Sequence, residues 1–349
     1  MDKQTQKLGR KAKIVTQAKG NGYTFIDLFA GIGGIRSAFE RVGGRCVFSS
    51  EIDESCQEMY ETNFGHRPYG DITKIPSDFI PDHDILTAGF PCQAFSIIGD
   101  MLGFADTRGT LFFEIERILR DKRPKAFLLE NVKQLVSHDK GRTFKVILNK
   151  LERLGYSVHS KILNGLHYGV PQKRERVIIV GFKENHPFRF PDKGIGKQLT
   201  LRDILEPDDL VDKKFFVSKH IEKKLKERVK VIPDYPTIWH ENKAGNIGIH
   251  PFSCALRANA SHNYLLVNGR RRLTPKEMLR LQGFPEYFKI VVSDAQVRKQ
   301  AGNSVVIPMI ESVAEAMIIA MQKPPVFAYT QSSFKSKFEE ERFSYAKEQ

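Results

Sequence analysis

The feature that most constrains the fold is an alternation of short apolar runs with helix-like segments from Thr24 to about Val180. The apolar runs lack the every-second-residue polarity of a sheet with one wet face, so each is expected to be a strand buried on both sides. Strands alternating with amphipathic helices build a parallel sheet covered on both faces. We therefore predict an α/β fold with a doubly wound, mostly parallel sheet. The expected strands are 24–30, 46–53, 83–90, 125–132 and 175–182, and the expected helices are 35–43, 54–64, 110–124, 143–155 and 306–321.

The amino-acid composition of the sequence changes after about Lys183. Residues 183–270 are richer in proline, charge and short irregular pieces, which predicts a second, smaller domain. Helical periodicity returns in the final helix, where Met309, Ile310, Val313 and Met317 share one face. We expect five parts: a basic arm (1–22), a large domain (23–182), a small domain (183–270), a return to the large domain (271–324) and a polar tail (325–349).

The net charge indicates which class of binding partner suits this protein. The chain carries a formal charge of +14, which favours a polyanion, and nucleic acid is the usual one. No run of about 18 apolar residues is present, so we expect no membrane span, and the N-terminus does not read as a secretory signal. The four cysteines share no CxxC spacing, which argues against a zinc site and a disulfide framework.

A glycine-rich turn follows the first expected strand. Gly31, Gly33 and Gly34 stand before a helix, where missing side chains let a ligand approach the backbone. The second strand ends at Glu51, which can accept hydrogen bonds from a ribose diol. Asp71 in "GDIT" is expected at a further strand end, suited to an adenine amino group. Together these residues favour an adenosine site, although a plain tight turn fits the glycines equally well.

Three further strand ends carry reactive side chains. Cys92 follows Pro91 directly after an apolar run, and loops beyond such strands are where active sites lie. Glu130, in "LLENV", is a candidate acid near that thiol. Arg174 and Arg176, in "QKRERV", are two residues apart and so lie on one side of an extended segment. Guanidinium groups there suit an anion or a carbonyl oxygen, and an exposed basic strand edge is the alternative.

Six blocks, taken in order, resemble the cytosine-5 DNA methyltransferases, most closely the bacterial modification enzymes. The blocks are "DLFAGIGG", "GFPCQAFS", "ENV", "QKRERV", "RLTPKEMLRLQGFP" and "AGNSV". Any one block alone is weak evidence for this family, whereas six blocks in the same order are highly specific evidence. The resemblance implies a class I, Rossmann-like methyltransferase domain and makes residues 183–270 a target-recognition domain.

The resemblance also implies a role for each reactive residue. Cys92 would attack C6 of cytosine, which makes C5 nucleophilic toward a methyl donor. Glu130 would hydrogen-bond the N3 and N4 edge and supply a proton at N3, which requires a raised pKa. Arg176 would hold O2, and Arg174 would help to position Cys92, the base or the backbone. The base that removes the C5 proton is not identified.

The implied cofactor is S-adenosyl-L-methionine, with S-adenosyl-L-homocysteine as its product. By resemblance, the methionine side is bound at the glycine turn, the adenosine at the second strand, and the sulfonium beside the thiol, while residues from the end of the chain close the pocket. These residues are Phe29, Ala30, Gly31, Gly33, Gly34, Glu51, Ile52, Asp71, Ile72, Pro91, Leu111, Asn303, Ser304 and Val305.

The implied substrate is double-stranded DNA with the target cytosine flipped out of the helix. Residues 93–110 are expected to close over that base, with Gln93, Ser96 and Ile97 near the gap or the phosphate. The recognition region ends in "HPFSCALRANASHN", where Ala255, Leu256 and Arg257 are candidate DNA contacts; Ala255 stands where relatives often carry threonine. The basic block 219–230 is either a phosphate-binding face or a solvated helix.

The sequence also bears on two other functions. A transfer RNA cytosine-5 methyltransferase usually has almost no recognition domain, whereas about 85 residues stand there in this chain. A catalytically silent DNA-binding scaffold is expected to have lost Cys92, Glu130 or Arg176, and all three are present. We expect a monomer in the bacterial cytoplasm, at the nucleoid, with a cognate restriction endonuclease that acts independently as a candidate partner. The target sequence does not follow from the residues.

Overall fold

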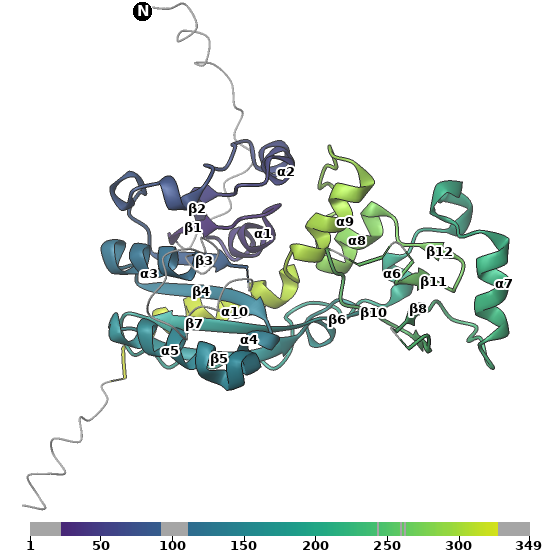
Figure 1. Ribbon diagram of the computed structural model, residues 1–349. Helices are drawn as coiled ribbons and strands as arrows, with labels where there is room; N and C mark the ends of the chain where they lie inside the picture. The colour runs from purple at the N-terminus through teal and green to yellow at the C-terminus, as the bar shows by residue number, and fades with distance from the viewer. Residues whose placement is uncertain (1–21, 92–110, 243, 259, 262, 327–349) are drawn as a thin grey trace, which may run out of the picture.

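The larger of two main sheets forms the centre of the molecule in the computed structural model, which describes residues 22–91, 111–242, 244–258, 260–261 and 263–326 (Figure 1). Its strand order is β2-β1-β3-β4-β7-β5. Strands β1 to β4 pair in parallel, whereas β7 is antiparallel to both β4 and β5. The predicted mostly parallel sheet is therefore confirmed. Its strands are β1 (Thr24–Leu28), β2 (Arg45–Ser50), β3 (Ile85–Gly89), β4 (Ala126–Val132), β5 (Ser157–Asn164) and β7 (Glu175–Phe182).

Helices cover both faces of this sheet (Figure 1). On one face α1 packs against α10, and on the other α3 and α5 are joined by the Lys150–Glu116 ion pair. Two separate hydrophobic cores result, one on each face. The helices are α1 (Gly34–Arg41), α2 (Glu54–Phe64), α3 (Leu111–Lys122), α4 (Gln134–Ser137), α5 (Arg142–Arg153) and α10 (Ile307–Met321).

Strand β4 shows why the apolar runs are continuous. Ala126 and Leu128 belong to the core under α1 and α10, whereas Phe127 and Leu129 belong to the core under α3 and α5. Because successive side chains of a strand point to opposite faces, a strand between two cores needs apolar residues at every position. All four side chains are fully buried, so the continuous run follows directly from the layered architecture.

Strand β5 was not predicted. It lies at the edge of the sheet, and most of its residues are half-buried or exposed, including Ser160 and Lys161. Its sequence therefore lacks a continuous apolar run. The final helix was predicted correctly, and Met309, Ile310 and Val313 on its inner face are fully buried.

A smaller, four-stranded sheet lies beside the large one, with the order β12-β11-β8-β9 (Figure 1). A short parallel pair, β6 with β10, runs between the two sheets. The helices of this part include α8 and α9, which lead back to α10. The elements are β6 (Gln172–Lys173), β8 (Ile238–Glu241), β9 (Ile247–His250), β10 (Ser253–Cys254), β11 (Leu266–Val267), β12 (Arg271–Arg272), α6 (Leu201–Ile204), α7 (Lys219–Glu227), α8 (Pro275–Gln282) and α9 (Asp294–Asn303).

One stretch, Asp294–Met321, is long and apolar enough to cross a membrane by composition. It contains two helices, α9 and α10, which are separated at Ser304. Of its most apolar window, 61% is buried inside the protein, which identifies it as a core segment of the fold.

A buried ion pair ties the smaller sheet to α8. Arg271 donates from Nη2 to Oε1 of Glu277 and from Nη1 to Oε2, both at 2.9 Å, and the two side chains are 1% and 0% exposed. The Glu277 carboxylate also accepts from the backbone N–H groups of Glu206 and Thr274 at 2.8 Å each. Its four bonds offset the cost of removing both charges from water.

Replacing Glu277 with glutamine is therefore expected to destabilise the fold strongly, because the Arg271 charge loses its fully buried partner and keeps only the partly exposed Asp208. The expected loss is about 3–5 kcal/mol, measured as the change in urea unfolding free energy. Glu286→Gln is the control, since Glu286 pairs with Arg280 at the surface and its loss should cost at most about 1 kcal/mol. Equal losses in both variants would contradict this account.

Candidate active site

A cavity of about 580 Å³ opens at the carboxyl ends of the parallel strands. It is lined by the turn after β1, by the ends of β2, β3 and β4, and by the segment between α9 and α10. Every predicted cofactor residue except Gly33 lies on its wall, together with Glu130, Arg174 and Arg176. The predicted cofactor residues found there are Phe29, Ala30, Gly31, Gly34, Glu51, Ile52, Asp71, Ile72, Pro91, Leu111, Asn303, Ser304 and Val305.

The turn after β1 has an unusual backbone. Phe29, Gly31 and Gly33 all have positive φ, at 55°, 54° and 81°, a region that favours glycine. Gly33 lies behind the cavity wall rather than on it, because a Cβ there would approach the Phe64 ring to 2.2 Å. Gly34 faces Ser304, whose Oγ would lie 2.8 Å from an added Cβ. The turn is thus held closely between α2 and the segment before α10.

The Glu51 carboxylate braces this turn. Its Oε2 accepts from the Gly31 N–H at 2.7 Å, and its Oε1 accepts from the Asp53 N–H at 2.8 Å. Burial raises the pKa of Glu51, and these backbone hydrogen bonds oppose that rise. Since each carboxylate oxygen has a second lone pair, the same group can still accept hydrogen bonds from a ligand.

Asp71 lies at the cavity rim, but not at a strand end as expected. It caps the short 3-10 helix η1 (Ile72–Lys74), and its Oδ1 accepts from Thr73 N at 3.0 Å and Thr73 Oγ1 at 2.8 Å. Only an isolated bridge, Ser50 to Tyr69, precedes it. Ile52 also lines the cavity and is 70% exposed, so it offers an apolar surface there.

Glu130 and Arg176 form an ion pair on the cavity wall. Arg176 donates from Nε to Glu130 Oε1 at 2.9 Å, and the side chains are 13% and 9% exposed. The antiparallel register of β4 and β7 places Arg176 beside Val132 and so brings the two motifs together. Burial raises the pKa of Glu130, while the charges of Arg176 and Arg174 oppose the rise. Glu130 Oε2 lies toward Gly89 at the end of β3.

Arg174 is buried and bonded to the backbone. It donates from Nη1 to the Leu256 carbonyl and from Nη2 to the Gly302 carbonyl, both at 2.9 Å, and also to the Ser304 carbonyl. Burial and the neighbouring Arg176 lower the pKa of Arg174 from 12.5 to about 9. Of the two predicted arginines, only Arg176 contacts Glu130; Arg174 holds three parts of the chain around the cavity.

Cys92 and the loop residues Gln93, Ser96 and Ile97 lie outside the described residues. The chain leading to the thiol is held by Asn131, whose Nδ2 donates to the Phe90 carbonyl at 2.8 Å. The "ENV" block therefore contributes Glu130 to the cavity and fixes the backbone immediately before Pro91.

The candidate DNA contacts near β10 occupy different environments. Leu256 is 3% exposed and faces a second cavity, while Ala255 is half-buried. Arg257 is exposed, and its guanidinium lies 5.1 Å from the centre of the Tyr264 ring. The next residue, Ala258, lines the large cavity and packs against Gly302, so Arg257 stands at the cavity mouth.

Sequence reasoning missed several residues of the wall. Lys299 and Gln300 directly precede the "AGNSV" block, and Lys299 pairs with Asp53 at 2.7 Å across the cavity edge. The only sequence signal for these two residues was their position immediately before a recognised block. Within the described ranges no group of three or more His, Cys, Asp or Glu side chains could hold a metal ion, and Cys46, Cys56 and Cys254 are free thiols.

A buried carboxyl group lies beneath the glycine turn. Asp27 in β1 is 0% exposed, its Oδ1 accepts from Thr87 Oγ1 at 3.2 Å, and its Oδ2 has no partner among the described residues. Burial raises the pKa of Asp27 from 3.8 to about 8, although the Arg36 charge opposes the rise. The folded protein therefore favours the neutral acid here.

Comparison with known proteins identifies relatives over most of the chain. The family model for C-5 cytosine-specific DNA methylases matches residues 23–319. The type II methyltransferase M.HaeII of Haemophilus aegyptius is 60% identical over 297 residues, covering 85% of this chain and 93% of the relative. M.NgoBI of Neisseria gonorrhoeae, also a type II methyltransferase, is 57% identical over 290 residues, covering 83% and 91%.

Solved structures share the fold at lower sequence identity. A Spodoptera frugiperda DNMT2 mutant superposes with a TM-score of 0.67 at 22% identity, covering 84% of this chain and 99% of that one. A putative DNA modification methyltransferase encoded within an Escherichia coli prophage gives 0.66 at 20%, covering 86% and 100%. These likenesses establish the class of fold.

The buried Asp27 predicts a pH-dependent stability. The unfolded chain ionises this group near pH 3.8 and the folded chain near pH 8, so its stabilising contribution is complete below pH 3.8 and is lost progressively up to pH 8. The unfolding free energy of the wild type should therefore fall relative to that of Asp27→Asn, by up to about 1.4 kcal/mol per pH unit. Urea unfolding of both proteins at several pH values in this range measures the difference in unfolding free energy. Parallel pH profiles for the two proteins would refute the prediction.

Proposed function

The chain belongs to the C-5 cytosine-specific DNA methylase family and is a DNA cytosine-5 methyltransferase; from this premise we propose that it transfers the methyl group of S-adenosyl-L-methionine to C5 of a flipped-out cytosine through a covalent Cys92 adduct. One observation supports the proposal above all others. Glu130 and Arg176 pair at 2.9 Å on the wall of the cavity that also contains the glycine turn and Glu51.

The residues of the cavity fit the proposed cofactor. Glu51 has free lone pairs for a ribose diol, Ile52 offers an exposed apolar side chain for an adenine ring, and the glycine turn leaves backbone accessible. A volume of about 580 Å³ lies within the range of about 300–1,000 Å³ found for small-molecule and cofactor sites. When bound, S-adenosyl-L-methionine supplies an electrophilic methyl group.

Glu130 is suited to move a proton at the base. The Cys92 thiolate forms a bond to C6, and the ring electrons move toward N3, which takes a proton from Glu130. The raised pKa of Glu130 keeps this carboxyl group protonated to a higher pH than in water. Its Oε2, which lies toward Gly89 and so toward the chain that leads to Cys92, is the proposed donor atom.

Arg176 is proposed to hold O2 of the base and to keep Glu130 in position. S-adenosyl-L-methionine, when bound, would supply the methyl group that the activated C5 attacks. A base then removes the C5 proton, the C5–C6 double bond forms again as the C6–sulfur bond breaks, Cys92 leaves as a thiolate, and N3 returns its proton to Glu130. Arg174 is proposed to act through the backbone, because its guanidinium donates to three carbonyl groups around the cavity.

We place double-stranded DNA above transfer RNA as the substrate. The family model that matches is that of DNA methylases, and the smaller sheet occupies the region expected to recognise duplex DNA. The net charge of +14 suits a phosphate backbone. Because two relatives are named type II methyltransferases, we also propose that the chain protects DNA beside a separate restriction endonuclease.

Replacing Cys92 with alanine is expected to abolish methyl transfer while DNA binding persists, because the nucleophile is lost and the phosphate contacts remain. DNA with 5-fluorocytosine at the target should trap the wild type covalently, since fluorine at C5 is not removed as a proton. A band of protein–DNA adduct resistant to denaturation measures this, together with methyl incorporation.

Cys46→Ala is the matched control, because Cys46 does not line the cavity and its loss should leave both the adduct and turnover in place. Methylation by the Cys92→Ala protein, or an adduct mapped to another residue, would disprove covalent catalysis by Cys92.

Glu130→Gln is expected to slow methyl transfer by about 10²–10⁴-fold, because glutamine cannot supply a proton at N3. In the wild type the single-turnover rate should fall as pH rises through the raised pKa of Glu130, and this limb should be absent in the variant. Glu116→Gln on α3 is the control, as that carboxylate pairs with Lys150 away from the cavity. An unchanged pH profile in Glu130→Gln would exclude this role.

A further inference from the structure

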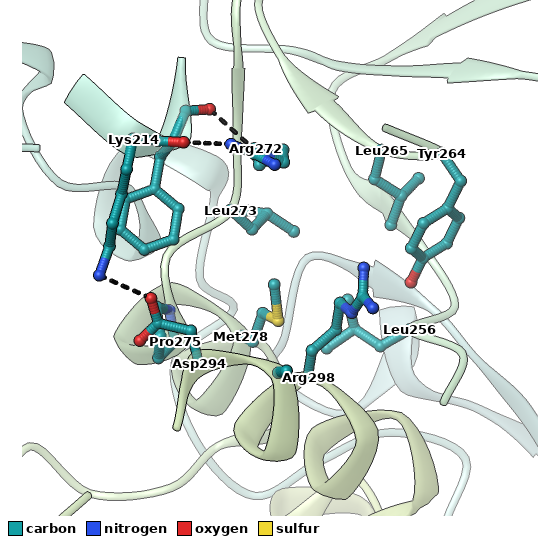
Figure 2. Close-up of a pocket in the computed structure, with 12 residues that line it drawn as sticks. Lys214, Leu256, Tyr264, Leu265, Arg272, Leu273, Pro275, Met278, Asp294 and Arg298 are labelled. Atoms are coloured by element: carbon teal, nitrogen blue, oxygen red, sulfur yellow. Dashed lines mark hydrogen bonds and ion pairs between the residues drawn. The ribbon is translucent and has the colours of Figure 1, made fainter. Parts of the chain in front are cut away.

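A second cavity, of about 260 Å³, lies where the smaller sheet meets α8 and α9 (Figure 2). Its walls come from four separate parts of the chain. Most of the lining is apolar, and most of the apolar side chains are themselves buried. The lining residues are Lys214, Phe215, Leu256, Tyr264, Leu265, Arg272, Leu273, Pro275, Met278, Asp294, Ala295 and Arg298.

Arg298 on α9 directs its guanidinium into this space, toward Met278 and Tyr264 (Figure 2). Its Nε and Nη1 atoms are buried and have no hydrogen-bond partner among the described residues. A buried donor without a partner is costly, and a charged donor more so. The cavity therefore contains a positive group with unsatisfied bonding capacity.

The other charged groups of the lining already have partners. Lys214 Nζ contacts Asp294 Oδ2 at 2.7 Å, and Arg272 donates from Nε to the Phe215 carbonyl at 3.3 Å and from Nη2 to the Lys214 carbonyl (Figure 2). Asp294 is one helical turn before Arg298 on α9, yet its carboxylate serves Lys214. Three positive charges face one negative charge in this lining, which leaves an excess of positive charge at Arg298.

We propose that this cavity binds a small organic carboxylate whose apolar body packs on the Leu273 and Met278 wall and whose carboxylate accepts hydrogen bonds from Arg298. The cavity is smaller than the range of about 300–1,000 Å³ typical of drug-sized ligands, so the ligand is of the size of one ring or a short chain. A guanidinium and a carboxylate form charge-assisted hydrogen bonds about twice as strong as neutral ones.

The shape of the site favours a small molecule over the DNA backbone. A phosphodiester is fully solvated on both sides and gains little from a wall of Leu256, Leu265 and Leu273, whereas an aromatic or aliphatic carboxylate gains apolar burial there. The site is also separate from the proposed chemistry, because no lining residue belongs to the Glu130 cavity. The inference does not rest on the proposed catalytic mechanism.

Isothermal titration of the full-length protein with benzoate tests the proposal, with benzyl alcohol as the neutral analogue of similar shape. We expect saturable binding of one benzoate per chain and at least tenfold weaker binding of benzyl alcohol. Arg298→Gln should weaken benzoate binding at least tenfold, which corresponds to about 1.4 kcal/mol. Met278→Phe should also weaken it by filling the apolar wall.

Arg202→Gln is the matched control, because Arg202 is an exposed arginine on α6 outside this lining, and it should bind benzoate like the wild type. Thermal unfolding of each variant separates loss of binding from loss of fold. The proposal is overturned if a folded Arg298→Gln protein binds benzoate as tightly as the wild type, or if the wild type shows no saturable binding. A third result would also overturn it, in which benzoate does not bind and Arg298→Gln weakens the salt dependence of DNA binding. A change in slope equal to the loss of about one phosphate contact would show that Arg298 contacts DNA.

Discussion

One buried guanidinium holds the active-site cavity together. Arg174 joins the Leu256 carbonyl of the smaller part of the molecule to the Gly302 and Ser304 carbonyls between α9 and α10. Each charge-assisted hydrogen bond contributes about 1.5–3 kcal/mol, which offsets the several kcal/mol needed to bury the charge. Because these carbonyls come from segments 82 to 130 residues away, this side chain joins distant parts of the chain at the C-terminal wall of the cavity, together with the Lys299–Asp53 ion pair.

The same contact links the segment between β7 and α8 to the large sheet. Residues between β7 and α8 form the smaller sheet. Arg174 bonds to the Leu256 carbonyl inside that segment, and the Arg271–Glu277 ion pair joins its end at β12 to α8. The region proposed to recognise DNA and the residues proposed for catalysis therefore lie on separate parts of one chain.

Much of the fold was predictable from the sequence. Strands packed between two hydrophobic cores need apolar side chains on both faces, so they can be recognised as continuous apolar runs. Strand β4 was found in this way, whereas the edge strand β5 was missed because half-burial leaves no such run. The site residues at strand ends were predicted because the fold brings those ends together. The context of Asp71 was wrong, since a turn-forming Asp-x-Thr can cap a helix as well as end a strand.

The sequence did not reveal that the two neighbouring arginines make different kinds of contact. Arg174 and Arg176 are two residues apart and chemically identical, and only the tertiary contacts show that one bonds to carbonyl groups and the other to a carboxylate. The difference matters because Arg176 offsets the charge of Glu130 directly, whereas Arg174 bonds to backbone carbonyl groups through Nη1 and Nη2, and its buried Nε has no partner among the described residues. Burial raises the pKa of Glu130. The carboxyl group can therefore stay protonated even beside an arginine. The positive charges of Arg176 and Arg174 oppose that rise, so burial is the factor that favours the protonated carboxyl group, and the backbone bonds of Arg174 hold the neighbouring segments around it.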